Sequence, residues 1–190
     1  AIGSMTDATH CLIAGSSGSG KTVLARQLHK DFSGVSVFLT PKQKEPVLKT
    51  NAPASIVQTE CQYDSDIDLV RNWAIGRPEK VQIIVDECQL SGLEQGSGPI
   101  VDGLHFDRDN KIKWVLVTQS PQDLSESYSA LQQCKRIYWV GPARTFHTGF
   151  LRYYQLGDID FPDRYNWIRI TPSIPPIVDG PFETQKRLAD

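Results

Sequence analysis

The stretch CLIAGSSGSGKT, residues 11–22, decides the fold of this chain. Within it, Gly15 to Thr22 fits the phosphate-loop pattern G-x-x-x-x-G-K-[ST] at every fixed position. The apolar residues 11–14 enter the loop as a strand would, and VLARQLHK leaves it as an amphipathic helix. A glycine-rich turn that binds nothing is the alternative, but strand, loop and helix in this order favour a site for a nucleoside triphosphate.

The loop has the chemistry that phosphate binding needs. Small side chains let successive backbone N–H groups point at phosphate oxygens, and the start of the following helix adds a favourable dipole. Lys21 is expected to reach the β- and γ-phosphates of ATP, and the Thr22 hydroxyl to ligate Mg²⁺. The residues expected to bind the nucleotide are Gly15, Ser16, Ser17, Gly18, Ser19, Gly20, Lys21, Thr22 and Val23.

Length and charge set the bounds of the prediction. The 190 residues suffice for one well-buried domain, and the net charge of -2 requires any nucleic-acid contact to come from local basic patches. No apolar run approaches the roughly 20 residues that span a bilayer. Residues 1–4 read as an expression remnant before Met5, residues 5–145 as a P-loop ATPase core, and residues 146–190 as a C-terminal extension.

The four cysteines, Cys11, Cys61, Cys88 and Cys134, are widely spaced and form no C-x-x-C pair. Cys11 and Cys134 lie in or beside apolar runs, where a free cysteine behaves as a small hydrophobe. We expect reduced thiols, no zinc site and a cytosolic setting.

Strand and helix signals alternate along the chain, which predicts an α/β domain with a mostly parallel sheet. After the first strand, the expected strands are residues 35–39, 55–58, 81–85, 113–118 and 136–140, and the expected helices are residues 21–30, 64–75 and 121–133. Asp64 or Ser65 is expected to cap the second helix. The proline-punctuated residues 40–53 are expected to form a surface excursion.

The pattern weakens after Gly141. Residues 165–171 alternate like an edge strand, and the proline-rich residues 172–181 are expected to be extended. Two interpretations of this tail stay open: a disordered end, or an arm that packs on a neighbouring subunit.

A second motif lies at the strand of residues 81–85, which ends in Asp86-Glu87. A buried strand of this kind delivers two acids to the carboxyl edge of the sheet, where ligands bind in open α/β folds. Asp86 is expected to hold Mg²⁺, and Glu87 to orient and deprotonate the water that attacks the γ-phosphate. A lone acid here could be a helix cap, but the pair beside a phosphate loop indicates hydrolysis.

A third motif is the strand of residues 114–117 followed by Thr118-Gln119. Polar residues end many strands, but an amide at this tip can both donate and accept hydrogen bonds. Gln119 is therefore expected to contact the γ-phosphate or the attacking water.

A phosphate loop, a strand ending in Asp-Glu and a strand ending in Thr-Gln-Ser-Pro together resemble the FtsK–HerA superfamily of DNA-pumping ATPases. The resemblance covers residues 11–141, includes Arg108 before the third motif, and implies a three-layer P-loop core of the RecA-like (ASCE) type. A chain this short most resembles the minimal genome-packaging ATPases of tailless icosahedral viruses with an internal membrane. The glycine-rich residues 91–103 and the region after Gly149 depart from the pattern.

The resemblance implies a ring, expected to be a hexamer, with ATP and Mg²⁺ between subunits. An arginine would complete each site in trans, with Arg108 the first candidate and Arg144 the second, unless both are solvated surface residues. It also implies a double-stranded DNA substrate, a capsid or membrane-protein vertex partner, and a location in the host cytoplasm or with the virion.

Basic residues offer candidate DNA contacts that would not read sequence. They are Lys42, Lys44, Lys49, Lys111 and Lys113, each of which would otherwise be a solvated charge. If they line a pore, DNA stimulates ATP hydrolysis, and charge reversal at Lys42 and Lys44 removes the stimulation.

Three other functions stay open. A small-molecule P-loop kinase would need an arginine-rich lid and an acceptor site. An assembly or secretion ATPase would act on protein partners and hydrolyse ATP without DNA. A nucleotide-binding switch would turn over negligibly, and Glu87→Gln would not alter it.

Overall fold

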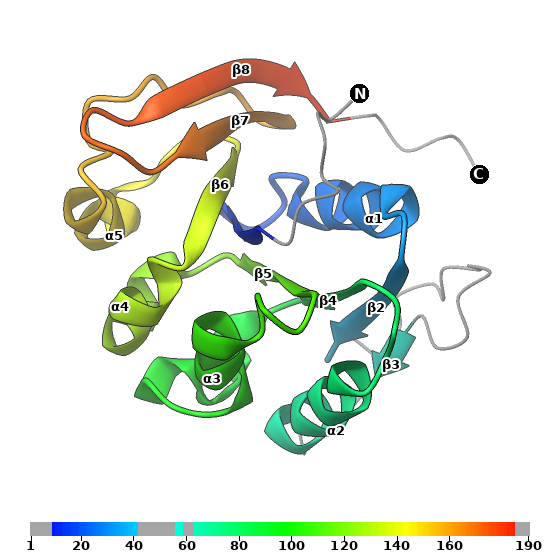
Figure 1. Ribbon diagram of the computed structural model, residues 1–190. Helices are drawn as coiled ribbons and strands as arrows, with labels where there is room; N and C mark the ends of the chain where they lie inside the picture. Colours follow the sequence, from blue (N-terminus) through cyan, green and yellow to red (C-terminus); the bar gives the residue numbers. More distant parts are fainter. Residues whose placement is uncertain (1–8, 42–55, 59–62, 185–190) are drawn as a thin grey trace.

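A computed structural model of the chain describes residues 9–41, 56–58 and 63–184. Within these residues the strands form one sheet in the order β3-β2-β4-β5-β1-β6-β7-β8 (Figure 1). The strands up to β6 pair in parallel, whereas β7 and β8 are antiparallel. The strand bounds are β1 His10–Ala14, β2 Val35–Thr40, β3 Ile56–Gln58, β4 Val81–Val85, β5 Ile112–Thr118, β6 Cys134–Val140, β7 Asn166–Thr171 and β8 Ile177–Glu183. The predicted α/β fold with a mostly parallel sheet is confirmed.

Helices cover both faces of this sheet, so the domain has three layers (Figure 1). One face packs against α1, and the other packs against the remaining α-helices. The helix bounds are α1 Lys21–Asp31, α2 Tyr63–Ile75, α3 Pro99–Phe106, α4 Tyr128–Leu131 and α5 Thr148–Tyr153.

The central strands are buried on both faces, which explains their continuous apolar sequences. Along β1, Leu12 and Ala14 join the cluster on the side of α2 and α3, while Cys11 and Ile13 join the cluster under α1. Because side chains alternate along a strand, one short apolar run fills two cores.

The connection from β5 to β6 differs from the predicted single helix at residues 121–133. It is the 3₁₀ helix η3 (Pro121–Ser127) followed by the short α4, and Leu124 breaks the helix with φ -96° and ψ 20°. Leu124 is fully buried, and the hydroxyl of Ser127 donates to the carbonyl of Leu93. Tertiary packing of this segment therefore overrides its helical periodicity.

The predicted cap of the second helix is wrong, because α2 already begins at Tyr63. Asp64 and Ser65 lie in its first turn. The Asp64 carboxylate instead accepts hydrogen bonds at 2.9 Å from the backbone N–H of Gly92, at the start of the 3₁₀ helix η2 (Gly92–Gln95). Asp64 thus anchors the glycine-rich segment that leads into α3.

The C-terminal residues 172–184 are not the disordered end that was one of the two alternatives, and their packing on a neighbouring subunit stays a prediction. They pair with their own sheet, since β8 lies against β7 with Ile170 opposite Val178 and Trp167 opposite Phe182. The expected edge strand, β7, is therefore interior, and β8 forms the edge. Pro181 lies in β8, in keeping with the confinement of proline to edge strands and bulges.

A buried ionic cluster fixes the amino end of β5. Asp107 is fully buried, and its carboxylate accepts two hydrogen bonds from Arg71 at 2.8 Å and one from the indole N–H of Trp114 at 2.9 Å. The hydrogen bond from Arg71 to Asp107 raises the pKa of the guanidinium. This cluster joins α2, α3 and β5.

Cys11, Cys88 and Cys134 are buried, and Cys61 lies outside the described residues. In the part of the chain that the structure describes, no helix combines the length and apolar character needed to cross a membrane. The same residues contain no cluster of three or more His, Cys, Asp or Glu side chains arranged to hold a metal ion. The expected surface excursion at residues 40–53 falls mostly outside the described residues.

Candidate nucleotide site

The phosphate loop connects β1 to α1 at the carboxyl edge of the sheet. Gly15 has φ +153°, and a Cβ there would stand 2.1 Å from the carbonyl oxygen of Val140. Gly18 and Gly20 have φ +71° and +105°, a region that favours glycine. The glycines of the motif are therefore required by the backbone path and by the close approach of β6.

Two side chains of the loop fit a phosphate ligand. Lys21 is 8% exposed, and its Nζ donates at 2.8 Å to the carbonyl of Ser16 across the loop. The hydroxyl of Ser19 is buried and has no hydrogen-bond partner among the described residues. A polyanion in the loop would supply acceptors to both groups.

Asp86 follows β4 and is 1% exposed. The hydroxyl of Thr40, at the tip of β2, donates to Oδ2 of Asp86 at 3.2 Å. The backbone N–H of Asp86 donates to Leu39 at 2.8 Å, which ties the two strand tips together. Such support orients the carboxylate, because hydrogen bonds to a metal-binding side chain fix its direction.

Glu87 has φ 51° and ψ 47°, a left-handed conformation that is uncommon for a residue with a side chain. Its backbone N–H donates to Oδ1 of Asp86 at 3.1 Å. The strand ends in this tight turn, which directs the two consecutive acids differently: Asp86 inward, and Glu87 into a partly exposed position. Strained backbone of this kind is concentrated at functional sites.

A chain of hydrogen bonds links Glu87 to the tip of β5. The amide N–H of Gln89 donates to Oε2 of Glu87, and the Thr118 hydroxyl donates to Oε1 of Gln89 at 2.9 Å. The N–H of Ser120 donates to the same Thr118 hydroxyl at 3.0 Å. The carboxylate fixes the orientation of the Gln89 amide, because a flipped amide would place its oxygen against a negative charge.

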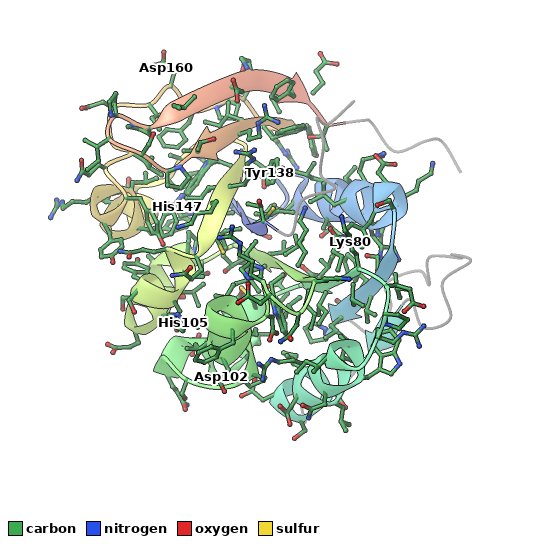
Figure 2. All side chains as sticks on the ribbon, viewed as in Figure 1. Lys80, Asp102, His105, Tyr138, His147 and Asp160 are labelled. Atoms are coloured by element: carbon green, nitrogen blue, oxygen red, sulfur yellow. The ribbon has the colours of Figure 1, made fainter. Side chains whose placement is uncertain are left out.

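Gln119 follows Thr118 at the same sheet edge and is partly exposed. His147, in the 3₁₀ helix η4 (Thr145–His147), is fully buried and lies beside β6, with its ring 4.9 Å from that of Trp139 (Figure 2). Burial lowers the pKa of His147, and interaction with the Gln119 backbone opposes that shift. The Nδ1 atom accepts from the N–H of Arg144 at 3.0 Å, which is consistent with a neutral ring.

The structure brings Lys21, Thr22, Asp86, Glu87 and Gln119 to one edge of the sheet. Arg108 lies elsewhere. It is exposed and precedes β5, which runs parallel to β1 with Thr118 opposite Ala14. Arg108 is therefore separated from its own phosphate loop by the length of β5, about 20 Å. Arg144 is exposed and follows β6, which runs parallel to β1, so it lies at the same carboxyl edge of the sheet as the phosphate loop.

The candidate DNA contacts divide three ways. The prediction that Lys113 contacts DNA is wrong, because this residue lies within β5 and its side chain is 2% exposed. Lys111 is exposed at the amino end of β5. Lys42, Lys44 and Lys49 lie outside the described residues.

Sequence reasoning missed two residues that contact the phosphate loop from the segment before β7. Arg164 donates through Nε to the carbonyl of Gly18 at 3.2 Å, and the N–H of Tyr165 donates to the carbonyl of Ser19 at 3.2 Å. It also missed Gln89, which belongs to no motif. The position of Gln89 two residues after the acids was the only signal for it.

No family model and no curated protein matches the chain. Solved structures do share its fold. The DNA-packaging ATPase B204 from Sulfolobus turreted icosahedral virus superposes with a TM-score of 0.68 and 16% identity, over 94% of this chain and 100% of that one. The similarity confirms the predicted likeness to viral packaging ATPases at the level of the fold.

Larger ATPases contain the same fold. The pCW3 conjugation coupling protein TcpA, with ATPγS, gives a TM-score of 0.65 at 12% identity over 95% of this chain and 62% of that one. EccC (ATPases 2 and 3) from Thermomonospora curvata, in complex with a signal sequence peptide, gives a TM-score of 0.60 at 9% identity. The match covers 95% of this chain and 38% of that one. The shared fold thus occurs in a DNA-packaging ATPase, a conjugation coupling protein and a secretion ATPase.

Proposed function

We propose that this chain is an ATP-hydrolysing motor that translocates double-stranded DNA, as a viral genome-packaging ATPase does. One observation carries the proposal: Asp86 and Glu87 leave β4 at the same sheet edge as the phosphate loop, and Gln89 joins Glu87 to the tip of β5. Nucleotide binding alone would not need a second acid held in this way.

Each residue has a role in hydrolysis. Lys21 and the loop N–H groups hold the phosphates, with Lys21 exchanging the Ser16 carbonyl for a phosphate oxygen. Thr22 and Asp86 would hold Mg²⁺, which neutralises charge on the β- and γ-phosphates.

Glu87 orients the attacking water and accepts its proton, and the water oxygen bonds to the γ-phosphorus as the bond to the ADP oxygen breaks. Gln119 contacts the transferred group. The buried position of Asp86 and the partial exposure of Glu87 suit these different roles, since the metal ligand is fixed and the base meets water.

The position of Arg108 supports a role in trans. An arginine at the amino edge of the sheet cannot reach the phosphates of its own subunit, but a head-to-tail neighbour can bring it there. Repeating this contact closes a ring, which we propose to be hexameric. Arg144 lies near its own phosphate loop, which makes it the weaker candidate for this role.

The fold shared with a DNA-packaging ATPase and a conjugation coupling protein supports DNA as the substrate. We propose that exposed basic residues, Lys111 among them, contact DNA phosphates without reading sequence. A capsid or membrane-protein vertex would dock the ring, placing the protein in the host cytoplasm or with the virion.

The test is the ATPase rate with and without double-stranded DNA, for wild type, Glu87→Gln and Arg108→Ala. We expect DNA to stimulate wild type, and both variants to bind ATP but hydrolyse little. Normal hydrolysis by Arg108→Ala would contradict the trans-arginine assignment. Absence of hydrolysis by wild type under all conditions would contradict the motor.

A second candidate is an ATPase that acts on a protein cargo. It is favoured by the same fold in EccC, whose structure contains a signal sequence peptide. Hydrolysis that DNA does not stimulate, together with no measurable DNA binding, would favour this candidate over the packaging motor.

A further inference from the structure

The segment before β7 holds the phosphate loop on the side away from the catalytic acids. Asp86 and Glu87 follow β4, and Thr118-Gln119 follows β5, while the phosphate loop follows β1. In the sheet these strands stand in the order β4-β5-β1-β6-β7. A γ-phosphate that faces Glu87 and Gln119 lies on the β5 side of the loop, so the rest of the nucleotide must leave toward β6 and β7.

Arg164 and Tyr165 lie on that second side. A Cβ at Gly18 would be 3.6 Å from Nη2 of Arg164, and a Cβ at Gly20 would be 3.4 Å from Cδ1 of Tyr165. Both side chains are thus next to the part of the loop that precedes α1, and the backbone N–H groups of such a loop cradle the α- and β-phosphates. Both residues are exposed, with Tyr165 at 50%.

The backbone of Tyr165 is held in an uncommon conformation, with φ 68°. Its N–H donates to Ser19 of the phosphate loop, and its C=O accepts at 2.8 Å from the N–H of Thr184 at the end of β8. These two bonds offset the cost of a left-handed conformation in a residue with a large side chain. They fix the backbone of Tyr165 and thereby hold its aromatic ring beside the phosphate loop.

The guanidinium of Arg164 lies over the Tyr165 ring, 4.7 Å from its centroid, and also bonds the Gly18 carbonyl. The two side chains therefore form a planar pair attached to the phosphate loop. Planar groups of this kind stack nucleobases, because every base has a π-face.

We propose that Tyr165, braced by Arg164, is the nucleoside subsite and stacks the base of the bound triphosphate. The assignment rests on the proposed function, since it requires a nucleotide in the loop. It adds a contact to the base, whereas the residues of the sequence motifs account only for the phosphates, metal and water.

Two probes separate the base from the phosphates: β,γ-methylene-ATP and inorganic tripolyphosphate, titrated by calorimetry. We expect Tyr165→Ala to lower the affinity for the ATP analogue roughly tenfold, the effect of losing one stacking contact between a base and a ring. The affinity for tripolyphosphate should be unchanged. Tyr165→Phe keeps the ring and should bind the analogue as wild type does. Steady-state kinetics should give a raised KM with an unchanged kcat.

Tyr153→Ala is the matched control. Tyr153 is 43% exposed on α5 and packs its ring on Tyr128, away from the phosphate loop. This variant should leave both affinities unchanged.

If Tyr165→Ala lowers the affinity for both probes equally, the proposal is overturned, because Tyr165 would then only support the conformation of the phosphate loop. Unchanged analogue affinity would also overturn it. If wild type binds neither probe, the proposed function itself is contradicted. Tight, Tyr165-dependent binding of the analogue, together with no hydrolysis of ATP by wild type, would contradict the motor and leave the subsite standing.

Discussion

The side-chain amide of Gln89 donates a hydrogen bond to the carboxylate of Glu87, two residues earlier in the chain. Gln89 is 6% exposed and also accepts from Thr118, so it cannot turn toward solvent without breaking both bonds. The direction of the Glu87 carboxylate therefore depends on the tip of a different strand.

We expect Gln89→Leu to lower kcat for ATP about tenfold or more, with KM nearly unchanged. Without the amide the carboxylate loses its fixed direction, and misplacement of a catalytic group by an ångström has effects of this size. Thr118→Val should act in the same way, and the double variant should lose little more than either single one, since both break one chain.

Gln82→Leu provides the control for this prediction. Gln82 is another buried glutamine, on β4, whose amide bonds the Leu28 carbonyl and the Ser36 hydroxyl away from the site. It should lower the free energy of unfolding without changing kcat. If Gln89→Leu leaves kcat at the wild-type level, the hydrogen-bond chain has no part in catalysis.

Thr40 supports the expected metal ligand Asp86. We expect Thr40→Val to raise the Mg²⁺ concentration needed for half-maximal hydrolysis by roughly tenfold, the usual effect of losing a hydrogen bond to a metal ligand. Thr40→Ser retains the hydroxyl and should behave as wild type. Equal Mg²⁺ dependence in Thr40→Val and wild type would separate Thr40 from the metal site.

Two helical glycines should respond oppositely to alanine. A Cβ at Gly103 in α3 would stand 2.5 Å from the indole nitrogen of Trp114, whereas a Cβ at Gly149 in α5 would meet nothing within 4 Å. We expect Gly103→Ala to destabilise the fold by about 1–3 kcal/mol through overpacking. Gly149→Ala should stabilise it by about 0.5–1 kcal/mol, because alanine is the better helix former.

Chemical denaturation measures both variants against wild type. Stability of Gly103→Ala equal to or above that of wild type would show that α3 is not packed against Trp114 as described.

Stability should fall as the pH decreases from about 6.5 to 4. Burial lowers the pKa of His10 from 6.5 to about 4, and burial also lowers the pKa of His29 and of His147. Between these pH values the unfolded chain binds a proton at His10 that the folded chain does not, so protonation favours unfolding. The stability contributed by neutral His10 is fully present above pH 6.5. By pH 4 the free energy of unfolding has fallen by about 3 kcal/mol through this one group.

Denaturation midpoints measured across this range in wild type and His10→Gln test the prediction. The variant should show a shallower decline, whereas replacement of the exposed His105, which projects from α3 away from the sheet (Figure 2), should leave the slope unchanged. An identical slope in wild type and His10→Gln would exclude His10 as its cause.

The sequence predicted the central strands and the phosphate loop because both are determined locally. Two-sided burial makes strands such as β4 almost continuously apolar, with Gln82 as its one polar residue, and the loop needs glycine at fixed positions. The order of the motifs then places their residues at one sheet edge without knowledge of any contact, because parallel strands end together.

Contacts between segments that are distant in the chain have no local pattern in the sequence that would predict them. Arg164 and Gly18 are 146 residues apart, and their hydrogen bond joins a side chain to a backbone carbonyl that any residue carries. β8 is exposed along most of its length and contains Pro181, so it lacks the alternation that marks a strand. The helix α3 does carry a start signal, Pro99 at its first position, within a glycine-rich stretch that otherwise suggests a loop.

Pro181 has a consequence for how copies of this molecule can meet. It stands in the outermost strand at a place where a proline offers no N–H to an approaching backbone, so a strand from a second copy cannot extend the sheet there by continuous pairing. Contacts through this edge must use side chains such as the half-exposed Ile177 and Phe182. A second copy that meets this edge is therefore held by side-chain contacts and not by the open-ended backbone pairing to which bare sheet edges are prone.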